Sequence, residues 1–144
     1  MSNPAIDLPM EMVINEQNLT LAAGSRTIFT TSPVPQITIS ASGWFAVMDY
    51  DYLVGTARAN VDGDLYLQFS CGGSTVSGST CGMVSEPGYQ HAYTMDMVTD
   101  ASDGTSLFYS CAFKSDIPAR YARAIYVNGS SVGSLNICVM KVPS

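Results

Sequence analysis

The chain has 144 residues, which suits a single domain with one hydrophobic core. Charged residues make up only 12% of the chain, and six Lys and Arg against twelve Asp and Glu give a net charge of −6. Only Arg120 and Arg123 are close together, and two arginines are too few for a phosphate-binding surface. No apolar run approaches the roughly 18 residues of a membrane span. We therefore expect neither nucleic acid nor a membrane as a partner.

The N-terminal segment is expected to be extended, because Pro4 and Pro9 disfavour a helix. Residues 1–9 are interpreted as a short extended N-terminal arm, and residues 10–144 as a single β-sandwich domain. The apolar residues that share one side of an extended segment here, and that we predict as an interface, are Ile6, Leu8, Met10 and Met12. This strip either belongs to the first strand of the domain's own sheet or lies along a neighbouring subunit.

Alternation of apolar and polar residues dominates the rest of the chain, and no window has the periodicity of a helix. The pattern predicts short strands near 10–14, 19–22, 26–30, 36–40, 44–48, 52–61, 64–69, 91–98, 105–113, 121–127 and 135–140. Asp62-Gly63 and Asn128-Gly129 each predict a hairpin between the strands that flank them. A series of this kind is typical of an all-β fold, here a single β-sandwich of jelly-roll type.

Four cysteines are present, and none has Cys-x-x-Cys spacing. With a single histidine in the chain, this spacing argues against zinc, and we predict no metal site. Cys71 and Cys81 bracket a Gly/Ser-rich loop that a disulfide could close. Cys111 and Cys138 lie inside apolar runs, so they are interpreted as small core residues rather than as a second disulfide. In a reducing cytoplasm neither disulfide would form before release.

The candidates for catalysis are few. His91 is the only histidine, and no Gly-x-Ser-x-Gly motif presents a serine to it, so we interpret it as an ordinary residue at the end of a strand. The pairs Asp49/Asp51 and Asp62/Asp64 could hold calcium or flank a glycosidic bond, but turn carboxylates in solvent are the favoured interpretation. We predict no catalytic residue, no cofactor and no enzymatic activity.

Four aromatic residues offer a different function. A platform on which sugar rings stack could be formed by Trp44, Tyr50, Tyr52 and Tyr66. The favoured interpretation of the single tryptophan is instead that it anchors the core of the sandwich.

Two stretches resemble a known class of proteins. These are residues 52–69, with a strand, Asp-Gly and a second strand, and residues 119–130, which contain Arg120-Tyr121 and end in Asn128-Gly129-Ser130. They resemble small β-sandwich virion accessory proteins of tailed bacteriophages, mainly head decoration or cement proteins and sometimes fibre or tail modules.

The resemblance implies a structural virion protein that stabilises the head by binding major capsid subunits, as a homo-oligomer and most simply a homotrimer. The alternative is a glycan- or receptor-binding module of a phage fibre or tail. The acidic balance favours the outer surface of the capsid over a DNA-facing lining. The first residues contain neither the cationic nor the apolar region of a secretory signal, so we expect synthesis in the host cytoplasm.

Overall fold

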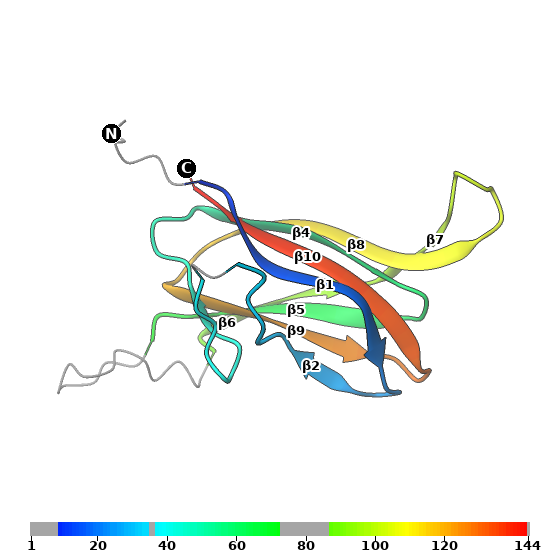
Figure 1. Ribbon diagram of the computed structural model, residues 1–144, viewed down its shortest axis with the longest axis horizontal. Coiled ribbons are helices and arrows are strands. Elements are labelled where there is room, and N and C mark those ends of the chain that lie inside the picture. The colour runs from blue at the N-terminus through cyan, green and yellow to red at the C-terminus, as the bar shows by residue number, and fades with distance from the viewer. Residues whose placement is uncertain (1–8, 35–36, 73–86, 144) are drawn as a thin grey trace.

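The computed structural model describes residues 9–34, 37–72 and 87–143 (Figure 1). This part of the chain contains ten β-strands and no helix, so the all-β prediction is confirmed. Accordingly, it contains no helix that could cross a membrane.

The strands form two antiparallel sheets that pack face to face (Figure 1). Sheet A has the order β1 (Glu11–Leu21), β10 (Gly133–Val142), β4 (Tyr52–Ala59), β8 (Leu107–Asp116) and β7 (Asp96–Thr99). Sheet B has the order β2 (Arg26–Ile28), β9 (Tyr121–Asn128), β5 (Gly63–Ser70) and β6 (Tyr89–Thr94), and the short β3 (Phe45–Ala46) also pairs with β9.

The order of the strands is that of a jelly roll. The first strand, β1, pairs with the last, β10, and the chain changes sheet repeatedly along its length, for example between β4 and β5, between β6 and β7, and between β9 and β10. This arrangement wraps one sheet over the other. The predicted β-sandwich of jelly-roll type is therefore what the chain forms.

The two predicted hairpins are wrong. Asp62-Gly63 joins β4 in sheet A to β5 in sheet B, and Asn128-Gly129 joins β9 in sheet B to β10 in sheet A. Turn-forming residues fix where the chain reverses, but they do not decide whether the next strand pairs with the previous one or crosses to the facing sheet. Each of these four strands buries one face, and crossing buries those faces against each other.

Four predicted strands also differ in extent. The strands expected at 10–14 and 19–22 are one strand, β1, because Asn18 adopts a φ of 55° where the register shifts and absorbs the irregularity as a bulge. The strand expected at 91–98 divides at the buried Met95 into β6 and β7, which belong to different sheets. Of the strand expected at 36–40, the described residues 37–40 contribute only a bridge between Ile39 and Phe45.

The core lies between the two sheets and is filled by aromatic and aliphatic side chains from both. The largest fully buried side chains include Phe45, Phe69 and Tyr126. Burial raises the pKa of Tyr126 to about 12. Its hydroxyl has no hydrogen-bond partner among the described residues, and it sits where a side chain on Gly63 would clash with it.

Three of the turns that carry the chain between the sheets meet at one end of the sandwich, and we call them the turn cluster (residues 22–25, 60–62 and 128–133). Asn128, whose side chain is buried, holds two of them together. Its Nδ2 donates to the carbonyl of Ala22 at 2.9 Å and to the carbonyl of Ser131 at 2.8 Å. Its backbone N–H donates to the carbonyl of Ser25 at 2.9 Å.

The third turn joins the cluster through further hydrogen bonds. The N–H of Gly129 donates to the carbonyl of Asp62 at 3.0 Å, and Asn60 Oδ1 accepts from the N–H of Ser134 at 2.8 Å. A Cβ on Gly129 would collide with the side chain of Asp62 and would lie 2.9 Å from its carbonyl oxygen. The Asn-Gly step is therefore required for a close approach between turns and not for a hairpin.

Replacement of Asn128 by Ala should lower the free energy of unfolding by about 2 kcal/mol, because one hydrogen bond between turns and one within the turn 128–133 are lost. Asn128→Asp should cost more, since a carboxylate would face the same two carbonyl oxygens. Urea denaturation of the isolated protein measures both effects. The matched control is Asn15→Ala, an exposed site on β1 where the change should stay within about 0.5 kcal/mol. Equal losses for Asn128→Ala and Asn15→Ala would contradict the role of Asn128 in the turn cluster.

Candidate functional site

The hairpin of β7 and β8 extends past the end of the sandwich (Figure 1). Within this hairpin Met97 lies opposite Tyr109, Val98 opposite Phe108, and Thr99 opposite Leu107. Directly opposed residues point to the same face of a two-stranded ribbon. Strand β4 reaches only as far as Tyr109, so within the described ranges the outer part of the ribbon has no neighbouring strand on that side.

The outer part of the hairpin exposes large apolar side chains. Leu107 and Met97 are 58% and 61% exposed, and they lie on the face that, farther along β8, carries the buried Phe113. That face belongs to the core in the body of the sandwich, but none of the described strands faces it at the end of the hairpin. Val98, on the other face, is 37% exposed. The hairpin thus offers apolar surface of the kind that monomeric proteins usually keep for a partner.

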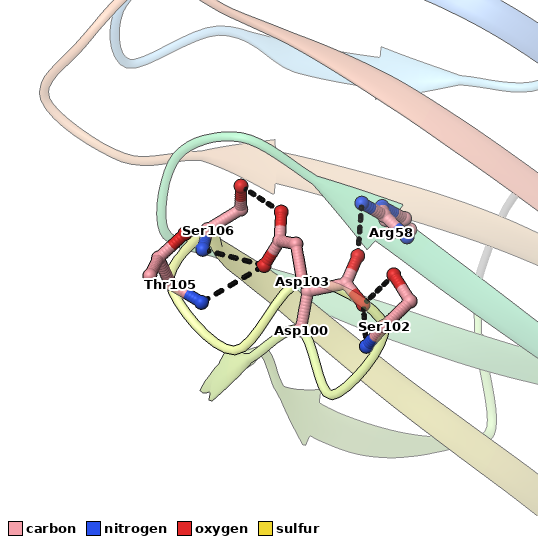
Figure 2. Close-up of polar contacts among 6 residues, drawn as sticks. All are labelled: Arg58, Asp100, Ser102, Asp103, Thr105 and Ser106. Atoms are coloured by element: carbon pink, nitrogen blue, oxygen red, sulfur yellow. Dashed lines mark hydrogen bonds and ion pairs between the residues drawn. The ribbon is translucent and has the colours of Figure 1, made fainter.

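The tip of the hairpin is held by carboxylates rather than by apolar packing (Figure 2). Asp100 accepts hydrogen bonds from the N–H and the hydroxyl of Ser102, at 2.9 and 2.6 Å. Asp103 accepts from the N–H of Thr105 and from the N–H of Ser106, both at 2.9 Å, and also from the Ser106 hydroxyl. These local bonds give the turn a fixed shape without a hydrophobic core.

Arg58 on β4 connects the hairpin to the body of the sandwich. Its guanidinium carbon lies 4.0 Å from the centre of the Phe108 ring, and its Nη2 lies 3.7 Å from a carboxylate oxygen of Asp100. A cation over an aromatic ring is attracted by the electrons of the ring face. The hairpin is therefore braced at its base and ordered at its tip, which suits a docking element better than a mobile loop.

The predicted arm interface lies partly within the described residues. Met10 is 53% exposed just before β1, and Met12 lies in β1 opposite Met140. Ile6 and Leu8 lie outside the described residues, so the boundary between arm and domain stays a prediction. Strand β1 is at the edge of sheet A.

The predicted disulfide between Cys71 and Cys81 also stays a prediction, because Cys81 lies outside the described residues; Cys71 is exposed at the end of β5. Cys111 and Cys138 are free thiols. They lie opposite Ala57 and Thr56, consecutive residues of β4, so their side chains are on opposite faces of sheet A.

The interpretation as core residues is wrong for Cys138 only, because Cys111 packs against the inter-sheet core. Cys111 is half-buried on the inner face of sheet A, whereas Cys138 is half-buried on the outer face, between the inward-facing Ile137 and Val139. Burial raises the pKa of both thiols.

The acid–base candidates do not gather into one site. His91 is exposed on β6 with its ring 4.5 Å from that of Tyr93. Asp49 and Asp51 are exposed in the turn before β4, and Asp62 is exposed in the turn cluster. Within the described ranges, no three His, Cys, Asp or Glu side chains form a group that could hold a metal ion.

The four aromatic residues of the suggested sugar platform lie in different places. Trp44 is only 2% exposed, but it packs against Arg123 and lies outside the main inter-sheet core. Tyr50 and Tyr52 are each covered by a lysine, and Tyr66 lies on β5 in the other sheet. The combined platform therefore does not form.

Comparison of the chain with family models, with curated proteins and with solved structures yields no match. The function must therefore be inferred from the geometry of the chain itself.

The tip of the hairpin should keep its shape at pH values well below the ordinary pKa of an aspartate side chain. The Ser106 hydroxyl and the N–H groups of Thr105 and Ser106 lower the pKa of Asp103 from its ordinary 3.8 to about 2. The stabilisation of the tip by the Asp103 carboxylate is thus fully present at a pH above its ordinary pKa and is lost as the pH falls through about 2. An NMR titration of the Thr105 and Ser106 amides should show a midpoint near 2, and Asp103→Asn should abolish that transition. A midpoint at the ordinary value would contradict the hydrogen-bonded tip.

Proposed function

We propose that this chain is a structural virion protein, a capsid cement or decoration protein that stabilises the head of a tailed phage. It binds major capsid subunits on the outer surface of the capsid and associates with copies of itself, most simply as a homotrimer at a three-fold site. It catalyses no reaction and uses no cofactor. The β7–β8 hairpin is the element that docks on the capsid.

The observation that carries the proposal is the apolar surface of that hairpin. Met97 and Leu107 together extend the core-facing side of sheet A into solvent. An isolated two-stranded ribbon is at best marginally stable in water, yet this one is braced by Arg58 and by the hydrogen-bonded tip. A rigid ribbon with exposed apolar side chains binds with little loss of conformational entropy, because it is already ordered.

The fold, the surface composition and the net charge are also compatible with a protein that functions within an assembly. Jelly rolls recur in viral capsid proteins, although lectins and cupins use them too, so the fold by itself does not decide the function. With only 12% charged residues, the surface is weakly polar and suited to contact with other subunits. The net charge of −6 favours the outside of a shell, since packaged DNA would repel it.

Self-association is supported by the edge of sheet A. Among the described strands, β1 pairs with β10 alone, and the exposed Met10 leads into it. An unpaired strand edge can accept an extended segment of another subunit through main-chain hydrogen bonds. The arm carrying Ile6, Leu8, Met10 and Met12 is the segment that we propose for this contact.

Docking through the hairpin is tested with the double variant Met97→Ser/Leu107→Ser in co-sedimentation with capsids of the phage that encodes the chain. The wild-type protein should bind capsids saturably. The variant should bind at least about tenfold more weakly, because two apolar side chains worth about 1.5–3 kcal/mol each no longer bury surface. The melting temperature should hardly change, since both side chains are exposed in the free protein.

The matched control is Met48→Ser. Met48 is 46% exposed, but it lies in the turn between β3 and β4 beside Arg120, away from the hairpin. It should bind capsids like the wild-type protein. Equal binding by the double variant and the control would refute hairpin docking, and a wild-type protein that does not bind capsids would refute the proposed function as a whole.

A further inference from the structure

The few cations of this chain are almost all engaged with aromatic rings. Of its six Lys and Arg residues, five lie over a ring, in the pairs Arg58–Phe108, Lys114–Tyr52, Arg120–Tyr121, Arg123–Trp44 and Lys141–Tyr50. Among the described residues, Arg26 is the cation with neither a ring nor a carboxylate as partner. A guanidinium left unpaired in an acidic protein is available to a ligand.

Arg26 lines a hollow on the outer face of sheet B. The hollow has a volume of about 250 Å³ and is also lined by Tyr66, Gln68, Gln90 and Ile125. Leu65, Leu67 and Phe69 point into the core from β5, so the residues between them point outward. In register, Tyr66 lies opposite Ile125, and Gln68 lies opposite Gln90, which brings four neighbouring strands to one place.

A relay of amide hydrogen bonds fixes the floor of this hollow. Gln68 is only 8% exposed, and its Oε1 accepts from Arg123 Nε at 2.7 Å. Its Nε2 donates to Gln90 Oε1, also at 2.7 Å. Arg123 is itself held by a hydrogen bond to the carbonyl of Ser42 at 2.9 Å and by the ring of Trp44, 4.5 Å away.

The relay determines which groups remain for a ligand. Because the Gln90 oxygen accepts from Gln68, the amide nitrogen of Gln90 keeps its two N–H donors. The Arg26 guanidinium adds a planar set of donors that matches a carboxylate, and the Tyr66 hydroxyl can donate or accept. The hollow therefore presents mainly donors, which select an anionic ligand rich in oxygen acceptors.

The size of the hollow and its apolar lining limit further which class of ligand it can bind. Its volume of about 250 Å³ is below the range of about 300–1,000 Å³ that is usual for drug-sized ligands, so it suits a single ring. The Tyr66 ring offers apolar contact to the less polar face of a sugar, beside the largely buried Ile125. On the same face Asp64 lies two strands from Arg26, with Val127 between them, and it disfavours a ligand of high negative charge.

We propose that this hollow binds a carboxylate-bearing sugar, a uronic or sialic acid residue of a glycan, with its carboxylate on Arg26 and its hydroxyls on Gln90 and Tyr66. The site belongs to sheet B, whereas the docking hairpin belongs to sheet A. Binding of an acidic glycan therefore does not depend on the proposed capsid contact.

The test is NMR titration of the full chain with two matched pairs of sugars: sialyllactose against lactose, and a glucuronate-containing oligosaccharide against its neutral glucose counterpart. At least one acidic sugar should shift the signals of Arg26, Tyr66 and Gln90 and bind at least about tenfold more tightly than its neutral counterpart, since hydrogen bonds to charged groups contribute about 1.5–3 kcal/mol. The pair that responds distinguishes a uronate from a sialate.

Arg26→Gln should weaken that binding by the same factor, whereas Arg120→Gln, which removes the same charge from a residue that does not line the hollow, should leave it within about twofold. Equal losses of affinity in the two variants would overturn the proposal, because the change in net charge alone would then explain the weaker binding. Absence of binding by both acidic sugars would overturn it as well. A glutamate-rich peptide that binds at Arg26 more tightly than either sugar would assign the hollow to an acidic protein segment instead.

Discussion

Two hydrogen bonds from the buried side chain of Asn128 hold together turns that lie more than a hundred residues apart in the chain, at Ala22 and at Ser131. These turns send the chain from one sheet to the other, so the facing of the two sheets depends on their close contact. Gly129 is part of the same constraint, because a side chain there would collide with Asp62. Once the turns are fixed, the alternation of apolar and polar residues along each strand directs the apolar side chains into one shared core.

The projecting hairpin follows from the same change of sheet. At Met95 the chain leaves sheet B for sheet A, with its N–H donating to the carbonyl of Gly63 at 3.0 Å. From that point β7 pairs with β8, which extends beyond the described strands of sheet B, so none of those strands faces Met97 and Leu107. With few charges to solvate such a ribbon, the chain orders its tip with Asp100 and Asp103. The two proposed binding surfaces thereby belong to different sheets, one for assembly and one for a small ligand.

Period-two alternation was sufficient to predict most strands and the jelly-roll class, because each strand is buried on one face. The turn motifs were located correctly, but Asp62-Gly63 and Asn128-Gly129 carry no information about which strand lies next in space, and both predicted hairpins were wrong. Met95 is one methionine in a continuous strand pattern, so no local signal marks the change of sheet there. The hollow around Arg26 was missed because Arg26, Tyr66 and Gln90 come from three separate strands and meet only in the folded sheet.

If the β7–β8 hairpin docks on the capsid, it must be ordered in the free protein and covered in the bound one. Hydrogen exchange of the backbone amides, measured on the free protein and on the protein bound to capsids, tests this most directly. We expect the amides that pair residues 96–99 with 107–110 to exchange measurably in the free protein and to become strongly protected on binding, while amides in the middle of β5 hardly change. Protection on capsid binding that spares the hairpin and falls elsewhere on the sandwich would contradict hairpin docking.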